Sequence, residues 1–144
     1  MRNLSIDLNA VNKKCVTVYG TPTPAIPTAE LAWGLIIGLL RQIAEEDRAT
    51  RLGTWQHTVR IGVAGKTLGI AGLGKLGSRL VCVGLAFGME DVAWSQTLTE
   101  EGCKEIGVSL VMKEELLARS DVLSIHLVLS DPPVGWLVPR SWHG

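Results

Sequence analysis

One segment decides the fold of this 144-residue chain, Lys66-Thr67-Leu68-Gly69-Ile70-Ala71-Gly72-Leu73-Gly74-Lys75-Leu76-Gly77. Its first half is a short apolar run that predicts a buried strand. Its second half has the spacing Gly-x-Gly-x-x-Gly and leads into residues 75–87, whose apolar side chains recur at helical intervals. A strand, a glycine turn and a helix in this order predict a site for a dinucleotide.

The three glycines of this spacing have different predicted roles. Gly72 permits a tight turn, Gly74 lets the backbone approach a pyrophosphate, and Gly77 lets the helix pack closely on the strand. The free N–H groups and the dipole at the start of the helix favour phosphate groups. A glycine-rich turn without a ligand is the alternative, and the strand before it and the helix after it disfavour that interpretation.

The segments that follow alternate between strands and helices. We expect strands over residues 92–95, 108–111 and 122–128, and helices over 99–106 and 113–119. Such alternation predicts a parallel sheet with right-handed crossovers. The predicted fold class is α/β, an incomplete Rossmann-type parallel sheet with flanking helices and a long apolar helix beside it.

The end of the second predicted strand departs from the usual dinucleotide pattern. Such sites carry an acidic residue about 20 positions after the glycines, where it binds the ribose hydroxyls, or an arginine nearby that binds a 2′-phosphate. This chain has Trp94-Ser95-Gln96 there instead. Ser95 and Gln96 can hydrogen-bond to either ribose, so the choice between NAD and NADP stays open.

Two carboxylates, Glu90 and Asp91, stand just before the second predicted strand. An unpaired carboxylate inside the protein would cost several kcal/mol or raise its pKa. We therefore expect the strand to begin one or two residues later, which leaves Asp91 in water.

The first 65 residues contain one long apolar segment. Residues 15–19 form a β-branched run that predicts a strand, and the prolines that follow predict an extended crossing segment. Thr28 is expected to cap a helix over residues 28–43, with Glu30 in its first turn. That helix is apolar nearly all round, which predicts cover on every side by a partner surface. An exposed helical continuation to Arg51 and a loop over 53–65 are expected next.

Composition excludes several classes of protein. Fourteen basic residues balance fourteen acidic ones, which argues against a nucleic-acid partner and against a polybasic membrane surface. The most apolar run, residues 31–40, is about half of a membrane span, and the first residues lack the apolar core of a secretory signal. Cys15, Cys82 and Cys103 have neither metal nor disulfide spacing, so we expect buried or half-buried thiols in a reducing cytoplasm.

Four stretches together resemble the nucleotide-binding domain of the D-isomer-specific 2-hydroxyacid dehydrogenases. They are Gly20-Thr21-Pro22-Thr23-Pro24-Ala25-Ile26-Pro27-Thr28-Ala29-Glu30-Leu31, residues 65–77, Ala86-Phe87-Gly88-Met89, and Ser120-Asp121-Val122-Leu123-Ser124-Ile125-His126-Leu127. The resemblance implies a nucleotide domain over residues 21–137, inserted into a flavodoxin-like substrate domain. Residues 1–20 would be a remnant of that second domain, and residues 138–144 a divergent tail. The apolar helix would be the interdomain and dimer-forming helix.

The resemblance also implies roles for individual residues. The backbone of Lys75 and Leu76 would contact the pyrophosphate of NAD or NADP. Ser95 and Gln96 would lie near the ribose, and Leu127 and Val128 near the adenine.

The catalytic residues of the family are not expected in this chain. Family members interconvert 2-keto acids and 2-hydroxyacids with an arginine and a histidine–glutamate pair, and these residues follow the fourth strand. Residues 136–144 do not continue the family pattern, so neither Arg140 nor His143 is expected to be catalytic. His126 is expected to hold structure, and His57 has no identifiable partner.

The sequence therefore predicts the NAD(P)-binding domain of a 2-hydroxyacid oxidoreductase, truncated at both ends and inactive alone. Its expected partners are a nicotinamide dinucleotide and a homo- or heterodimer partner at helix 28–43. Three alternatives stay open. The chain is active with catalytic groups recruited from a partner, or it is a non-enzymatic dimerisation module, or it is a gene fragment that does not fold stably.

Overall fold

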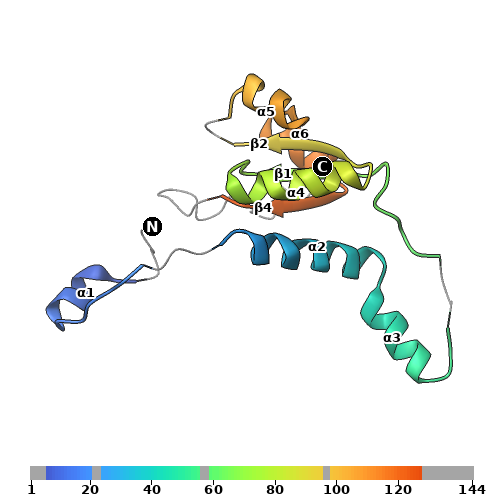
Figure 1. Ribbon diagram of the computed structural model, residues 1–144, viewed down its shortest axis with the longest axis horizontal. Helices are drawn as coiled ribbons and strands as arrows, with labels where there is room; N and C mark the ends of the chain where they lie inside the picture. The colour runs from blue at the N-terminus through green and yellow to red at the C-terminus, as the bar shows by residue number, and fades with distance from the viewer. Residues whose placement is uncertain (1–5, 21–23, 56–58, 96–97, 128–144) are drawn as a thin grey trace.

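The computed structural model describes residues 6–20, 24–55, 59–95 and 98–127. The elements in chain order are α1 (Leu8–Lys13), α2 (Ile26–Leu40), α3 (Ile43–Arg51), β1 (Thr67–Ala71), α4 (Lys75–Ala86), β2 (Glu90–Trp94), α5 (Glu100–Ile106), β3 (Ser109–Leu110), α6 (Lys113–Arg119) and β4 (Val122–Ile125). Helix α2 runs beside α4, whereas α1 lies apart from the sheet (Figure 1).

The strands form one four-stranded parallel sheet in the order β3-β2-β1-β4. The chain steps from β1 to β2 and β3 on one side and then returns to place β4 on the other side of β1. This change of direction is the topological switch point, outside which open parallel sheets bind their ligands. The predicted α/β fold with a parallel sheet and flanking helices is confirmed.

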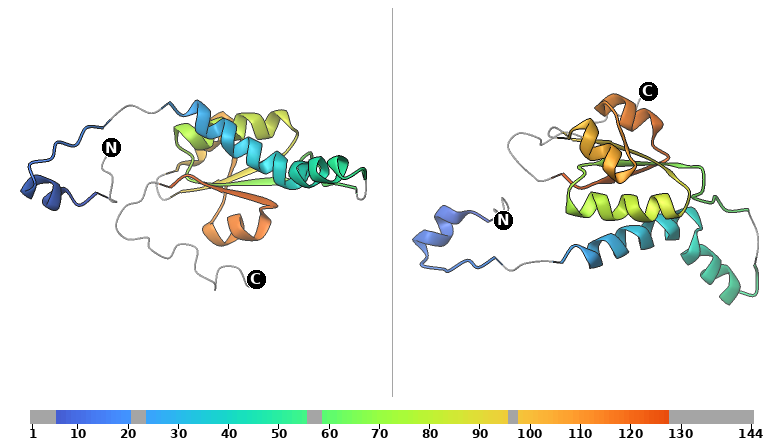
Figure 2. Two further views of the ribbon diagram at one scale, coloured as in Figure 1. Left: turned by 90° about the horizontal axis from the view of Figure 1, so that it is seen from below. Right: turned by 45° about the horizontal axis from the view of Figure 1, so that its top comes forward.

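Helices cover both faces of the sheet. Because alternate residues of a strand point to opposite faces, β1 contributes to two apolar clusters. Leu68 and Ile70 pack with Leu80 of α4, whereas Ala71 packs with Leu116 of α6. Figure 2 shows α4 and α6 on opposite sides of the sheet, with α2 outside α4.

Helix α2 packs against the core beside α4 with its buried Ala29 and Trp33 and with half-buried residues of the same helix. The Trp33 Nε1 donates a hydrogen bond to the backbone oxygen of Leu80 at 3.2 Å, and the ring of Trp33 lies 5.2 Å from that of Phe87. Only Ala29 and Trp33 of α2 are buried. The expectation of cover on every side is therefore not met here, because this chain packs only one face of the helix.

The N-terminal region differs from the prediction. The expected strand over residues 15–19 is not formed, and the helix α1 precedes it, capped by Asp7, whose side chain accepts from the backbone N–H of Asn9 and Ala10. A β-branched run forms a strand only beside a pairing edge, and no strand of the described residues lies next to this segment (Figure 1).

The apolar helix also begins and ends at other residues than expected. Helix α2 begins at Ile26, not after a cap at Thr28, because Pro27 fits the first turn, where an N–H has no helical partner. It ends at Leu40, and Gln42 adopts a left-handed conformation that separates it from α3. No helix among the described residues has the length and apolarity needed to cross a membrane.

Strand and helix bounds further along agree with expectation within a few residues. Helix α6 is the predicted one, and Thr99 caps α5 by accepting from Gly102 N. Strand β4 ends at Ile125, before the predicted end at Val128, which lies outside the described residues. Of the cysteines only Cys103 is buried, whereas Cys15, which follows α1, and Cys82 of α4 are exposed, contrary to expectation.

The expectation that Asp91 stays in water is wrong. Strand β2 begins at Glu90, so Asp91 pairs with Leu68 inside the sheet and is only 5% exposed. Glu90 points to the opposite face and remains exposed, as strand alternation requires. Both carboxylate oxygens of Asp91 are buried without a hydrogen-bond partner in the described part of the chain, and this burial raises its pKa to about 6.

Candidate functional site

The carboxyl ends of three strands are joined by backbone hydrogen bonds. Gly72 N donates to the oxygen of Trp94, the last residue of β2, at 2.8 Å. His126 N donates to the oxygen of Ala71, the last residue of β1, at 2.7 Å. The glycine loop after β1 is thereby anchored to both neighbouring strands, at the edge of the sheet where the switch point lies.

The fold itself requires glycine at position 72. Its φ is +97°, a conformation that side chains with a Cβ rarely adopt. A Cβ there would also lie 2.8 Å from the backbone oxygen of His126 and 3.1 Å from Leu127 N. The turn after β1 therefore packs directly on the residues that follow β4.

The fold also requires glycine at position 77. Gly77 lies in the first turn of α4, and a Cβ there would stand 2.5 Å from the oxygen of Gly72 and 3.0 Å from the side chain of Ile70. This is the close helix–strand packing that the glycine spacing predicts.

Gly74 is different, because no contact with the described residues requires a glycine there. Its φ of −94° and ψ of −162° suit any residue, and a Cβ at this position would meet no atom of the described residues within 4 Å. Gly74 is exposed and directly precedes α4. Its missing side chain leaves open space in front of the first turn of the helix.

The N-terminus of α4 fits an anion. No side chain caps it, and its first turn contains no acidic residue. The first N–H groups of a helix have no helical partner, and the helix dipole adds partial positive charge at this end. Lys75 is exposed at the first helical position and Leu76 is half-buried. The open space at Gly74 and the uncapped helix together leave room and partial positive charge for an anionic group.

Two of the other predicted site residues, Ser95 and Leu127, are among the described residues, and both lie at this edge of the sheet. Ser95 directly follows Trp94, which holds the loop, and is half-buried. Leu127 is half-buried and packs against the cluster of Ala71 and Leu116. Gln96 and Val128 lie outside the described residues, so the predictions made for them stay predictions.

His126 directly follows β4, and its ring contacts a serine of that strand. Its Nε2 lies 2.8 Å from the Ser124 Oγ, and burial lowers the pKa of the imidazole. The ring is therefore neutral at pH 7 and occupied by a neighbour on its own chain segment, which agrees with the expected structural role. His57, Arg140 and His143 lie outside the described residues.

Residues before β4 align the sheet in a way that the sequence patterns did not reveal. The carboxylate of Asp121 accepts from Thr67 N at 2.9 Å and from Lys66 Nζ at 3.1 Å, and these bonds lower its pKa. A Cβ at Gly69 would lie 1.8 Å from the Ser120 Oγ, so that glycine makes room for the serine. The position of Ser120 and Asp121 just before a predicted strand is the one sequence feature that hints at these contacts. Their partners could not be identified from it, because they lie 51 or more residues earlier in the sequence.

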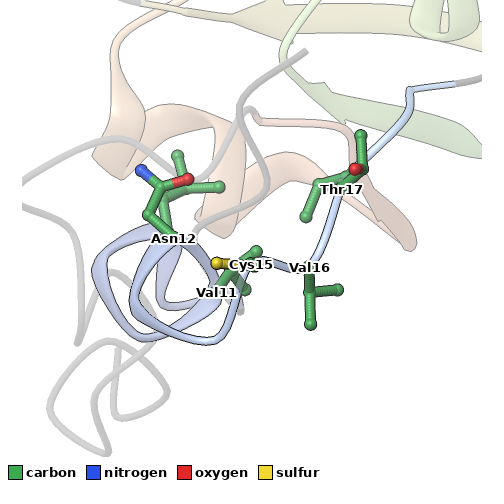
Figure 3. A pocket seen from close by; sticks show the side chains of 7 residues that line it. Val11, Asn12, Cys15, Val16 and Thr17 are labelled. Carbon is green, nitrogen blue, oxygen red and sulfur yellow. The ribbon is translucent and has the colours of Figure 1, made fainter.

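A pocket elsewhere in the chain is separate from this site. Its lining consists of side chains from one continuous segment around α1, drawn as sticks in Figure 3. The lining residues are Leu8, Val11, Asn12, Cys15, Val16, Thr17 and Val18. None of them belongs to the sheet or to the glycine loop.

Known proteins with similar sequences share the glycine-loop domain. The family described as "D-isomer specific 2-hydroxyacid dehydrogenase, NAD binding domain" matches residues 33–135. The glyoxylate reductase of Aeropyrum pernix is 37% identical over 89% of this chain and 43% of its own length. The D-3-phosphoglycerate dehydrogenase of Bacillus subtilis is 35% identical over 92% of this chain and 26% of its own. The chain thus spans less than half of these relatives.

Solved structures agree with the sequence comparison. A phosphoglycerate oxidoreductase from Vibrio cholerae superposes with a TM-score of 0.83 at 32% identity, over 91% of this chain and 43% of its own. A D-lactate dehydrogenase from Aquifex aeolicus, complexed with NAD and lactic acid, superposes with a TM-score of 0.70 at 32% identity, over 87% of this chain and 38% of its own. The strand order, the glycine loop at the switch point and the match over residues 33–135 lead to one conclusion: the chain belongs to the D-isomer-specific 2-hydroxyacid dehydrogenase family, through its NAD-binding domain.

Proposed function

We propose that this chain binds a nicotinamide dinucleotide, NAD or NADP, at the carboxyl edge of its sheet. The observation that carries the proposal is the open space at Gly74. Packing and backbone conformation account for Gly72 and Gly77, but not for Gly74, where a side chain would meet no atom of the described residues. Other exposed glycines such as Gly62 share this open space, but Gly74 directly precedes the uncapped N-terminus of α4, so we attribute this glycine to a ligand at the helix end.

The family assignment supports a specific placement of that ligand. The backbone N–H groups of Lys75 and Leu76 bind the pyrophosphate, Ser95 the ribose, and Leu127 the adenine, with Gln96 and Val128 proposed beside them. The nicotinamide supplies hydride-transfer chemistry when it is bound. The residues of this chain bind and orient the dinucleotide.

Titration with NADH tests this proposal. Energy transfer from the tryptophans to the nicotinamide reports binding, and the backbone of Trp94 contacts the loop through Gly72 N. We expect saturable binding to the unmodified chain and at least a tenfold loss in Gly74→Val, since tenfold in affinity corresponds to about 1.4 kcal/mol of lost contact. Gly62→Val is the matched control, because Gly62 is exposed and also has open space around it. Equal binding by Gly74→Val and Gly62→Val would contradict the proposal.

The reaction of the family, interconversion of 2-keto acids and 2-hydroxyacids, is proposed for the assembled protein, not for this chain alone. Within the described residues no histidine is paired with a carboxylate, and His126 engages Ser124 instead. The chain also spans only 43% of the glyoxylate reductase and 26% of the phosphoglycerate dehydrogenase that it resembles. We expect no NADH oxidation with glyoxylate or pyruvate above a protein-free control. Keto-acid-dependent oxidation by the purified chain would show that it is catalytic.

A second proposed function is association through α2. Leu31, Leu35 and Leu39 recur at every fourth position and are 64%, 65% and 77% exposed, so they form an apolar stripe. Trp33 lies on the packed face instead. We propose that this stripe contacts a second copy or a homologous subunit.

The mass of the chain in solution tests the association. Light scattering is expected to show a dimer for the unmodified chain and a monomer for Leu35→Glu. Leu52→Glu is the matched control, because Leu52 is 70% exposed but lies beyond α3, outside the stripe. A monomeric unmodified chain would rule out the homodimer and leave the heterodimer, which the same measurement tests in a mixture with a full-length relative.

The proposed domain division places the nucleotide domain at residues 21–137, with residues 1–20 belonging to a flavodoxin-like substrate domain and 138–144 as a tail. The separation of α1 from the sheet supports the first boundary (Figure 2). Limited proteolysis is expected to cleave near residue 20 and leave the sheet intact. Protection of that region would argue for a single unit.

A further inference from the structure

Helix α4 and strand β2 meet at Gly84 and Asp91. Both carboxylate oxygens of Asp91 are buried, and a Cβ at Gly84 would stand 2.7 Å from Oδ1 and 3.0 Å from Oδ2. The backbone of Gly84 is also joined to the turn that leads into β2, since its oxygen accepts from Met89 N at 3.0 Å. The side chain of Leu68 lies 3.0 Å from the same Cβ position. The carboxylate is therefore enclosed where α4, β1 and β2 meet.

No charged side chain of the described residues compensates the carboxylate of Asp91. Neither of its oxygens has a hydrogen-bond partner there, and burial alone raises its pKa. The ionisable groups on the elements packed around it are neutral, paired or exposed. They are Cys103 of α5, a buried thiol whose pKa is raised, Lys66 before β1, which pairs with Asp121, and the exposed Arg79, Cys82 and Glu90. The protonated form of Asp91 is therefore easier to bury than the charged form.

The same two elements carry the proposed dinucleotide site at their other ends. The last residue of β2, Trp94, accepts from Gly72 N and so holds the glycine loop, and α4 begins at Lys75 with its uncapped N–H groups. A strand rises about 3.3 Å per residue and a helix about 1.5 Å, so Asp91 lies about 10 Å along β2 from Trp94, and Gly84 about 14 Å along α4 from Lys75. A separation of α4 from β2 at Asp91 would therefore shift the two sides of the site relative to each other.

We propose that ionisation of Asp91 loosens the contact between β2 and α4, so that the chain binds a nicotinamide dinucleotide more tightly in mild acid than at higher pH. This inference rests on the proposed dinucleotide site. A buried charge without a partner is stabilised by water, which reaches it when the helix moves away from the strand. The protonated form favours the closed arrangement, and by linkage a nucleotide that binds this arrangement favours the protonated form.

Isothermal titration calorimetry with NAD at pH 5.5 and pH 8 tests the proposal. The dissociation constant of the unmodified chain is expected to rise about fivefold or more between these values, because the pKa of Asp91 is about 6 and the carboxyl group loses its proton in this interval. In Asp91→Asn and Asp91→Val, which have no carboxyl group at this position, it should change by less than about twofold. Glu90→Gln is the matched control, since Glu90 is the exposed neighbour on the same strand, and it should keep the full pH dependence.

The outcomes separate this inference from the proposed function. A pH dependence that both neutral variants abolish and Glu90→Gln retains supports the inference. An equal dependence in Asp91→Asn and Asp91→Val overturns it and assigns the effect to another group, such as His126. A dissociation constant that does not change with pH also overturns it and leaves the dinucleotide site in place. Loss of the native circular dichroism at pH 8 overturns it too, because the whole fold then opens instead of one contact. Failure of NAD to bind a chain with native circular dichroism at either pH overturns the dinucleotide site itself.

Discussion

The carboxylate of Asp91 lies directly against the backbone of Gly84. A Cβ added at Gly84 would stand 2.7 Å from Oδ1 and 3.0 Å from Oδ2 of Asp91. Strand β2 and helix α4 thus meet at a point where one residue has no side chain and the other has a buried carboxylate without a partner among the described residues. Desolvation disfavours the charged form, which is why the pKa of Asp91 is raised to about 6 from its ordinary 3.8.

Asp91 is expected to make the chain more stable in mild acid. A carboxyl group with a higher pKa in the folded state binds more protons there, so its contribution to stability is full below 3.8 and is lost as the pH rises through about 6. The difference corresponds to about 3 kcal/mol between low pH and pH 7. Urea unfolding at pH 5 and pH 7.5 covers about half of this difference, about 1.4 kcal/mol, and is compared with Asp91→Asn, which cannot ionise at this position. Asp121, whose pKa is lowered, changes the unfolding free energy with pH in the opposite direction, and it does so equally in the unmodified chain and in Asp91→Asn.

The control for this pH dependence is Glu90→Gln, since Glu90 is the exposed neighbour on the same strand. It should unfold with nearly the same pH dependence as the unmodified chain. If Asp91→Asn retained the full dependence, the buried carboxylate would not be its source.

Gly84 and Asp91 are expected to be energetically coupled. Gly84→Ala should destabilise the chain by about 1–3 kcal/mol, because the new methyl group overlaps the carboxylate of Asp91 and lies 3.0 Å from the Leu68 side chain. In an Asp91→Val background the overlapping oxygens are gone, so the same change should cost less. A double-mutant cycle of unfolding free energies measures the difference, and a coupling energy of zero would mean that the contact carries no strain.

Trp33 is expected to contribute more to stability than any exposed tryptophan. Trp33→Ala removes a buried side chain, 7% exposed, and should cost about 3–5 kcal/mol. Trp33→Phe keeps most of the packing and loses the hydrogen bond to Leu80, at a cost of about 1 kcal/mol. Trp55→Ala is the matched control, because Trp55 is exposed, and should change stability by about 0.5 kcal/mol or less. Equal effects of the two alanine variants would mean that α2 is not docked on α4 in solution.

Substitutions of Gly72 and Gly74 are expected to affect different properties, the first the stability of the fold and the second the binding of NADH. Gly72→Ala places a Cβ at a φ of +97° against the backbone of His126, and should lower stability by about 1–3 kcal/mol. Gly74→Ala should leave the thermal midpoint nearly unchanged and weaken NADH binding. Thermal unfolding and NADH titration of both variants separate the two roles. A large loss of stability in Gly74→Ala would assign that glycine to the fold instead of the ligand.

Much of the nucleotide fold could be predicted from local patterns. The spacing of Gly72, Gly74 and Gly77 between an apolar run and a helical one identified the turn, and periodicity located α4, α6 and the four strands within a few residues. These signals act over a few residues, since they depend on backbone conformation and on which side chains share one face. They are therefore readable without knowledge of the rest of the chain.

Other features depend on contacts between distant segments. The β-branched run at residues 15–19 predicts a strand, but a strand needs a pairing neighbour, and no described strand pairs with this run. Asp91 was expected in water because burying a carboxylate is unfavourable, yet the pairing of β2 with β1 carries it inside opposite Leu68. Its burial is decided by the whole register of the sheet, not by its own preference.

The sequence by itself determined the α/β class, the glycine turn after β1 and the uncharged segment at Ser95. Only the tertiary structure decided that Gly74 has no role in packing, that α2 covers α4 with one face and leaves its leucines exposed, and that Asp91 lies against Gly84. The physical reason is the sequence separation over which each property is determined. Backbone preference and periodicity are local properties of a segment, whereas burial and steric fit are properties of pairs that only folding brings together.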